Sequence, residues 1–247
     1  MGILEAATQY LQFSEYVVHN ARHILDEKNR QFVETIVKLG RMRTETVAEG
    51  TVLYRAQIGH EWRDTTFDGD GGEAGEYRVR CPHKSDRMTP FADRATEGRV
   101  NAKGIPCLYT ATDTETAIYE VRPWTGSYVS VAAFLTHREL KLVDCSKRRL
   151  RGGRQFATQD EHLWQRINRA FSEPVSRTDD VAEYAPTQVL AEAFHHDGCD
   201  GIKYSSSRKG GVNIALFSLN TAIATVITLY KVQEMKLYYR SVTDFEI

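Results

Sequence analysis

Apolar and charged residues alternate with helical spacing in the first fifth of the chain. Phe32 and Ile36 lie on one side of such a pattern, with charged residues between them. We therefore expect residues 3 to about 47 to be helical. The segment carries no catalytic pattern, so we interpret residues 1–50 as a helical extension that packs against the rest of the chain or binds a partner.

After residue 50, short apolar runs typical of strands are mixed with amphipathic stretches typical of helices. The pattern lacks the regular alternation of strand and helix that builds a parallel sheet, so we expect an α+β fold for residues 51–247. Strands are expected at 52–54, 107–109, 128–135, 140–143, 201–204, 213–217, 223–230 and 235–242, and helices at 113–122, at 155–171 and from 186 onward.

One stretch, residues 63–98, shows no sustained period. It is rich in Gly, Asp, Glu and Arg, which is typical of a solvated connection rather than of a packed element. We interpret it as a long polar loop. Its position immediately before Arg99 leaves two readings open, a lid over a binding site or a tolerated surface insertion.

Composition narrows the class of protein. The chain has 247 residues, 41% of them hydrophobic and 26% charged, with a formal net charge of −1. These values are ordinary for a globular protein and lack the basic surplus of a nucleic-acid binder. No apolar run is long enough to cross a membrane, and the N-terminus does not resemble a signal peptide, so a cytoplasmic location is expected.

The potential metal ligands are scattered. The four cysteines form no CxxC pair, so we expect free thiols, no metal site and no disulfide framework. No motif for a bound cofactor is identified either.

The most informative carboxylate is Glu120. A helix beginning near Asp113 places Ala117, Glu120 and Val121 at positions i, i+3 and i+4, beside the face that turns inward. An inward carboxylate is costly unless it is paired, and Arg99 and Arg122 are candidate partners nearby in the sequence. The alternative, a glutamate at the edge of the apolar face that reaches solvent, remains open from periodicity alone.

Several short motifs occur in a fixed order around this glutamate. They are Arg55 after an apolar strand, Gly98-Arg99-x-Asn101 with Gly104-x-Pro106-x-Leu108-Tyr109, Glu120 in a short helix, and Asp200-Gly-Ile-x-Tyr204-x-Ser206 with Asn213-x-Ala215-Leu216-Phe217. Over about residues 51–220 the chain resembles the RES domain family, named for its Arg, Glu and Ser.

The resemblance implies an ADP-ribosyltransferase-like fold, with a mixed β core and flanking helices. It also implies degradation of NAD⁺ by phosphorolysis or hydrolysis, and a toxin paired with a helix-turn-helix antitoxin or another inhibitor. NAD⁺ is then the substrate rather than a cofactor, inorganic phosphate is a candidate co-substrate, and direct binding to nucleic acid or membrane is not expected. A homodimer is left open.

By the same resemblance, the expected catalytic residues are Arg99, Tyr109, Glu120 and Ser206, and the expected substrate-binding residues are Tyr54, Arg55 and Asn101. The chain departs from the family pattern in two places. Val100 stands where a Trp often follows the arginine, and Ser205 stands where a proline often precedes the serine. Because serines occupy positions 205, 206 and 207, the choice among them stays open.

The residue types also fit the chemistry. Cleaving the nicotinamide–ribose bond develops positive charge on the sugar, which a carboxylate such as Glu120 can stabilise. The pyrophosphate requires planar cationic groups, which Arg55 and Arg99 can supply. Tyr109 offers an aromatic face and Ser206 a hydrogen bond, although a core aromatic and a turn serine are the ordinary roles of such residues.

Two other functions compete with NAD⁺ cleavage. The first is transfer of ADP-ribose to a protein or metabolite. Arginine-directed transferases of this fold class often carry an acid two residues before the catalytic glutamate, where this chain has Ile118. The second is a non-catalytic module that binds NAD⁺ or ADP-ribose, against which the inward Glu120 argues, because a binder of anions gains little from a carboxylate.

Overall fold

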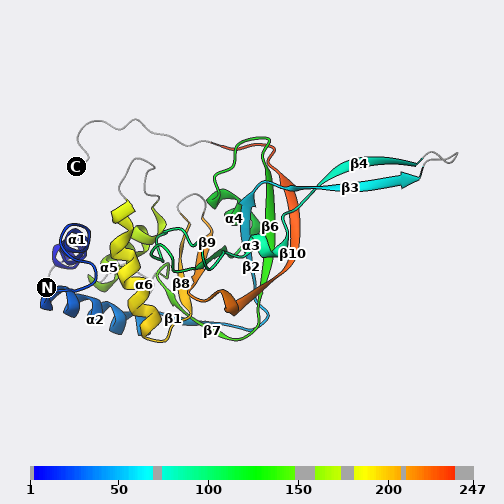
Figure 1. Ribbon diagram of the computed structural model, residues 1–247. Coiled ribbons are helices and arrows are strands. Elements are labelled where there is room, and N and C mark those ends of the chain that lie inside the picture. The colour runs from blue at the N-terminus through cyan, green and yellow to red at the C-terminus, as the bar shows by residue number, and fades with distance from the viewer. Residues whose placement is uncertain (1–2, 69–73, 148–158, 174–180, 207–209, 237–247) are drawn as a thin grey trace, which may run out of the picture.

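The core of the molecule is one mixed sheet (Figure 1). A computed structural model describes residues 3–68, 74–147, 159–173, 181–206 and 210–236. The eight strands lie in the order β1 (Thr44–Val47), β7 (Leu140–Asp144), β8 (Gly201–Ser205), β9 (Val212–Leu216), β5 (Leu108–Ala111), β2 (Val52–Ile58), β6 (Tyr128–Thr136) and β10 (Ala222–Lys231).

The strand pairing weakens at one place near the middle of the sheet. Neighbouring strands are antiparallel except β7 and β8, which run parallel. Between β2 and β5, however, the register contains a single pair, Tyr54 opposite Ala111. The sheet is therefore held together loosely between these two strands.

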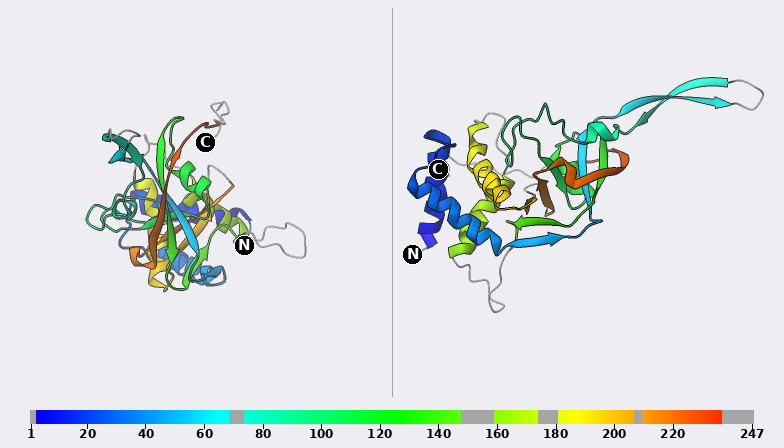
Figure 2. Two further views of the ribbon diagram at one scale, coloured as in Figure 1. Left: turned by 90° about the vertical axis from the view of Figure 1, so that its right-hand side faces the viewer. Right: turned by 60° about the horizontal axis from the view of Figure 1, so that its bottom comes forward.

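Four helices gather beside the β7–β9 part of the sheet (Figures 1 and 2). They are α1 (Ile3–His19), α2 (Glu27–Arg41), α5 (Gln159–Ser172) and α6 (Ala185–His196). Helix α4 (Thr114–Glu120) contacts β2, β5 and β6. The short elements are α3 (Ser85–Met88), η1 (Val181–Tyr184) and η2 (Leu219–Thr221). No helix among these described residues is both long and apolar enough to cross a membrane.

Alternation along the strands divides the core between the two faces of the sheet. In β9, Ile214 and Leu216 belong to one apolar cluster, whereas Ala215 belongs to the cluster beneath the four helices. Such alternation is what a strand covered on both faces requires. The predicted α+β fold with a mixed β core and flanking helices is confirmed.

The first two helices pack into the larger of these clusters. Phe13 of α1 and Ile36 of α2 are fully buried there together with Phe194 of α6. A Cβ at Gly40 would lie 2.9 Å from the Phe194 ring, so glycine lets α2 approach α6 closely. Residues 44–47, predicted as the end of the helical stretch, form strand β1 instead, because pairing with β7 outweighs their local preference.

The polar stretch 63–98 is not one long loop. Two strands, β3 (Glu61–Asp68) and β4 (Ala74–Cys81), pair into an antiparallel ribbon that projects far from the rest of the molecule (Figures 1 and 2). We call this ribbon the arm. The prediction of a loop was wrong for residues 63–68 and 74–81. In β4, Tyr77, Val79 and Cys81 alternate with arginines, as in a strand, but the run is short and β3 has no matching alternation.

Smaller differences concern the ends of elements. The helix expected to begin near Asp113 is capped by Asp113 itself, whose carboxylate accepts a hydrogen bond from the Thr116 amide at 2.8 Å. Of the strand predicted at 235–242, residues 235–236 are not in a strand, and the remainder lies outside the described residues. All four cysteines are free thiols, as predicted.

Candidate active site

A cavity of about 270 Å³ opens where β2, β5 and β9 meet α4. It lies at the weakly paired junction of β2 and β5, where Tyr54 stands opposite Ala111. The fold therefore gathers side chains from distant parts of the sequence around one space. Of the residues predicted for the site, those that line this cavity are Tyr54, Arg55, Arg99, Tyr109 and Glu120.

Glu120 is held by two neutral donors. Its Oε1 atom accepts hydrogen bonds from Ser206 Oγ at 2.7 Å and from Asn213 Nδ2 at 2.8 Å. Within the described part of the chain Glu120 forms no ion pair, so the predicted pairing with Arg99 is absent. Two bonds on one oxygen restrain the orientation of the carboxylate, which lines the cavity, and Oε2 takes no hydrogen bond from the described residues.

The structure distinguishes two of the three adjacent serines. Ser205 is turned toward α5, where its Oγ accepts a hydrogen bond from Asn168 Nδ2 at 3.1 Å. Ser206, one residue later, faces the opposite way and reaches Glu120, as side chains alternate along an extended chain. This geometry favours Ser206 over Ser205, and Ser207 lies outside the described residues.

The backbone at Gly211 approaches α4 closely, beside Ser206 and Glu120. Ser206 donates its amide to the Gly211 carbonyl at 2.9 Å, which joins the end of β8 to the beginning of β9. A Cβ added to Gly211 would lie 1.9 Å from Thr116 Oγ1 on α4. Only glycine fits there, so the position of Ser206 depends on a residue without a side chain.

Asn213 is a site residue that the sequence reasoning did not select. It lies on β9, is 3% exposed and lines the cavity. Its bond to Glu120 fixes the amide with Nδ2 toward the carboxylate, which leaves Oδ1 buried without a hydrogen-bond partner among the described residues. The motif Asn213-x-Ala215-Leu216-Phe217 contained the signal, but it served only as part of the family resemblance and as a strand, and no role was assigned to Asn213.

Arg99 approaches the cavity from a loop, residues 96–105, that we call the Arg99 loop. Its NH1 donates to the carbonyls of Phe171 and Ser172 at 2.7 and 2.9 Å. These carbonyls end α5, where the helix dipole favours a cation. A Cβ at Gly98 would lie 2.5 Å from the Tyr109 hydroxyl, so glycine is required beside Arg99.

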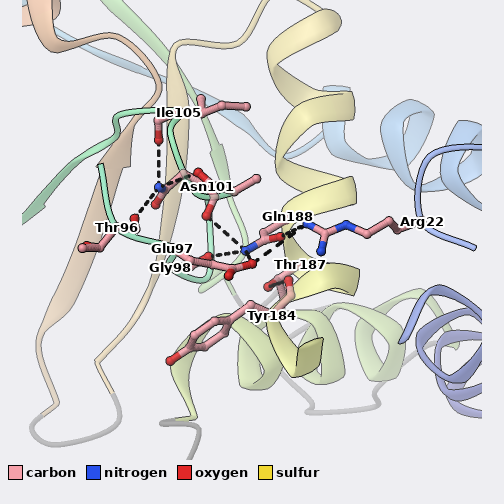
Figure 3. Close-up of polar contacts among 10 residues, drawn as sticks. Arg22, Thr96, Glu97, Gly98, Asn101, Ile105, Tyr184, Thr187 and Gln188 are labelled. Atoms are coloured by element: carbon pink, nitrogen blue, oxygen red, sulfur yellow. Dashed lines mark hydrogen bonds and ion pairs between the residues drawn. The ribbon is translucent and has the colours of Figure 1, made fainter. Parts of the chain in front are cut away.

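The side chain of Asn101 holds the Arg99 loop in place from within, through hydrogen bonds to its backbone (Figure 3). The residue is 5% exposed and does not line the cavity. Its Nδ2 donates to the carbonyls of Thr96 and Ile105 at 2.9 and 2.8 Å, and its Oδ1 accepts from the Tyr109 hydroxyl at 2.7 Å. A direct contact between Asn101 and substrate, as predicted, would require these bonds to break.

Gln188 of α6 fixes the same loop from another side (Figure 3). It is 1% exposed, and its Nε2 donates to the carbonyls of Gly98 and Asn101 at 2.8 and 3.0 Å. Its Oε1 accepts from Arg22 NH2 at 2.9 Å, and Arg22 also lies 4.0 Å from Glu97. The connection between α1 and α2 therefore reaches the Arg99 loop both through the buried amide of Gln188 and through Glu97.

Burial shifts the pKa values of Tyr109 and Arg55. It raises the pKa of Tyr109 well above its usual value, so the hydroxyl stays protonated and can donate to Asn101. Burial likewise lowers the pKa of Arg55, whose NH1 donates to the Tyr109 carbonyl at 3.1 Å. The Arg55 Nε atom is buried and has no partner among the described residues, so the site holds a desolvated cation with an unused donor.

The lining combines one carboxylate, two arginines and the rings of Tyr54, Tyr109, Tyr184 and Tyr204. Within the described residues there is no cluster of three or more His, Cys, Asp or Glu that could hold a metal ion. The groups present are suited to a flat aromatic ring, an anion and a developing positive charge.

Comparison with known proteins identifies the family. The model of the RES domain family matches residues 52–239, beyond the limit of 220 estimated from the motifs. No curated protein matches the chain. A similar solved structure is the crystal structure of the M. tuberculosis MbcT-MbcA toxin-antitoxin complex, with 12% sequence identity and a TM-score of 0.45 over 80% of this chain and 93% of that chain.

Proposed function

The chain belongs to the RES domain family, and on that premise we propose that it is an enzyme that cleaves NAD⁺ at the bond between nicotinamide and ribose. One arrangement supports this most strongly. Glu120, held by Ser206 and Asn213, faces a cavity whose other walls carry Arg55 and Arg99. An oriented carboxylate opposite two cations matches a substrate that is anionic at its phosphates and becomes positive at its sugar.

In the proposed reaction the bond between the ribose C1′ and the nicotinamide nitrogen breaks, and its electron pair leaves with nicotinamide. Positive charge then develops on C1′ and the ring oxygen, where the free oxygen of Glu120 stabilises it. Water or inorganic phosphate attacks C1′. Attack by water releases a proton and yields ADP-ribose, whereas attack by phosphate yields ADP-ribose with a phosphate on its anomeric carbon.

The other side chains bind and orient the substrate. The tyrosine rings offer flat apolar faces to nicotinamide. The guanidinium of Arg99, anchored through NH1 to the end of α5, presents its remaining donors to a phosphate, and Arg55 offers its unused Nε–H. The buried Oδ1 of Asn213 can accept a hydrogen bond from a ribose hydroxyl beside Glu120. Binding thus uses groups that are already in place, which reduces the entropy cost of reaching the transition state.

The direct test is to incubate the purified protein with NAD⁺, with and without inorganic phosphate, and to identify the products by mass spectrometry. Release of nicotinamide together with ADP-ribose in both conditions assigns hydrolysis, and phosphate-dependent release assigns phosphorolysis. Glu120→Gln, purified in parallel, serves as the control for contaminating activity. Absence of nicotinamide release in both conditions would contradict the proposal.

We further propose that the protein acts on the NAD⁺ pool of the cytoplasm as a toxin and is restrained by an inhibitor protein of the helix-turn-helix antitoxin type. Family membership supports this role. Induced expression of the wild-type chain should lower cellular NAD⁺ and arrest growth, while expression of Glu120→Gln should do neither. Growth arrest by both proteins, with NAD⁺ unchanged, would rule out NAD⁺ depletion as the cause.

A further inference from the structure

The active-site cavity is small for a dinucleotide. Its volume is about 270 Å³, whereas pockets for drug-sized ligands measure roughly 300–1,000 Å³. NAD⁺ consists of two nucleotides, so the nicotinamide half alone fills this space. The adenosine diphosphate half must then lie elsewhere on the surface.

A second cavity adjoins the first at Arg55. Its volume is about 590 Å³, and Arg55 lines both cavities. The rest of its wall comes from Gln57 on β2, from Glu61 and from residues 84–96, including α3. Two cavities that share one cationic side chain lie next to each other, as the two halves of a ligand with a central pyrophosphate require.

The charge of the second cavity is suited to an anion. Besides Arg55, its lining contains Lys84, Arg87 and Arg94, against the two acids Glu61 and Asp86. Among the described residues, neither Lys84 nor Arg87 takes part in an ion pair. These cations are thus available to a ligand rather than neutralised by the protein.

The cations are mounted on a fixed element. Gln57 Nε2 donates to the Arg87 carbonyl at 2.8 Å, which ties α3 to β2. Met88, the last residue of α3, is fully buried in the same apolar cluster as Ile214 and Leu216 of β9. Lys84 and Arg87 therefore stand at a defined place beside Arg55, so a ligand does not have to order the backbone that carries them.

An aromatic ring completes the second cavity. Phe91 lines it and is 54% exposed, so its ring is accessible to a ligand. The guanidinium of Arg94 lies 6.0 Å from the centre of this ring. Ring and guanidinium together offer the stacking surface that a purine base prefers.

We propose that the second cavity binds the adenosine diphosphate half of the substrate, with the pyrophosphate at Arg55, Lys84 and Arg87 and the adenine against Phe91. A phosphate oxygen at Arg55 would also give the buried Nε–H the hydrogen bond that it lacks among the described residues. The assignment depends on NAD⁺ being the substrate, as proposed above.

The test measures binding of ADP by calorimetry, because ADP needs no catalysis to be detected. Arg87→Ala and Phe91→Ala should each weaken ADP binding, Arg87→Ala by about tenfold for the loss of a charge-assisted phosphate contact. Arg63→Ala, an exposed arginine on the arm, is the matched control and should bind ADP like the wild type. Equal affinity in Arg87→Ala and the wild type would overturn the proposal.

Further measurements identify the ligand and distinguish this proposal from the proposed function. Adenosine and inorganic phosphate are each titrated against ADP, and phosphate that displaces ADP at equal concentration would show a site for the phosphate co-substrate instead. In NAD⁺ cleavage, Arg87→Ala should raise KM about tenfold with kcat unchanged. Loss of ADP binding in Arg87→Ala without any NAD⁺ cleavage by the wild type would contradict the function alone, whereas unchanged KM and unchanged ADP binding in an active enzyme would contradict the second cavity alone.

Discussion

The Arg99 loop and the arm are both polar excursions from the main sheet, and they are built in opposite ways. In the loop, Asn101 is 5% exposed and bonds to backbone carbonyls, and the buried amide of Gln188 holds the loop from outside. In the arm, Trp62 is 47% exposed and stacks with Arg80, whose guanidinium lies 4.6 Å from the ring centre.

This difference shows what prepares a polar segment for binding. The Arg99 loop satisfies its own backbone through side chains that lie beneath it, so the outward side of Arg99 faces the cavity in a fixed position. The arm satisfies its backbone by strand pairing. Its outer side chains interact with one another and with solvent, whereas at its base the Arg80 guanidinium lies 4.8 Å from the Tyr128 ring centre on β6 and Glu61 lines the second cavity. We therefore expect catalysis to depend on the loop and to be indifferent to the outer part of the arm, residues 63–79.

The largest effect within this comparison is expected from Arg99→Lys. Lysine keeps the charge but cannot bond to the end of α5 and to a phosphate with one planar group. We expect kcat/KM for NAD⁺ to fall by about 10²–10³-fold, nearly as far as in Arg99→Ala. Arg78→Lys, the same change on the arm, is the control. A fully active Arg99→Lys enzyme would show that geometry at this position is unimportant.

A smaller loss is expected from Gln188→Leu. Without the amide, the carbonyls of Gly98 and Asn101 lose their buried donor, so the free energy of unfolding should fall by about 1–3 kcal/mol. Because the loop relaxes, kcat/KM should also fall by about tenfold at a temperature where the variant is folded. Gln31→Leu, on the exposed side of α2, is the matched control. An activity equal to that of the wild type would exclude a positioning role for Gln188.

A few-fold loss is expected from Arg22→Ala. Arg22 is 34% exposed and contributes one hydrogen bond to Gln188, so its removal should reduce stability by only about 0.5–1.5 kcal/mol. The expected decrease is in kcat, with KM nearly unchanged, and Arg22→Lys should recover part of it. Arg30→Ala, an exposed arginine of α2, controls for loss of charge. Identical kinetics in Arg22→Ala and Arg30→Ala would mean that the N-terminal helices do not communicate with the loop.

No effect on turnover is expected from shortening the arm at residues 68–76. The arm points away from the body of the molecule, so it cannot cover the cavity in this arrangement (Figures 1 and 2). Hydrogen exchange with and without a non-cleavable NAD⁺ analogue should change at residues 84–96 and stay unchanged in β3 and β4. A change in turnover after shortening the arm would instead support a lid formed by the whole stretch 63–98.

The strands of the main sheet could be predicted from the sequence more readily than the strands of the arm. Periodicity predicted most strands of the sheet, because each strand buries side chains on at least one face. It failed for β3, which has no apolar alternation, and for β4, where only Tyr77, Val79 and Cys81 alternate with charged residues. Resemblance to a family identified Glu120 and Ser206, and the structure places them 2.7 Å apart between Oγ and Oε1.

Gln188 and Arg22 could not be predicted. They are separated by 166 positions and meet only because α6 and the connection between α1 and α2 pack in the same layer. A lone glutamine in an amphipathic helix and an arginine in a polar connection are ordinary surface residues by composition. Their roles depend on tertiary contacts, which no local pattern contains.

The most direct measurement is a comparison of Glu120→Gln with the wild type in NAD⁺ binding and NAD⁺ cleavage. Glutamine keeps an oxygen that can accept from Ser206 and Asn213, so the site should remain assembled. It lacks the negative charge needed in the transition state, so kcat should fall by about 10³-fold or more while the dissociation constant for NAD⁺ changes by less than about threefold. Cleavage of NAD⁺ by Glu120→Gln at the wild-type rate would contradict the proposed role of Glu120.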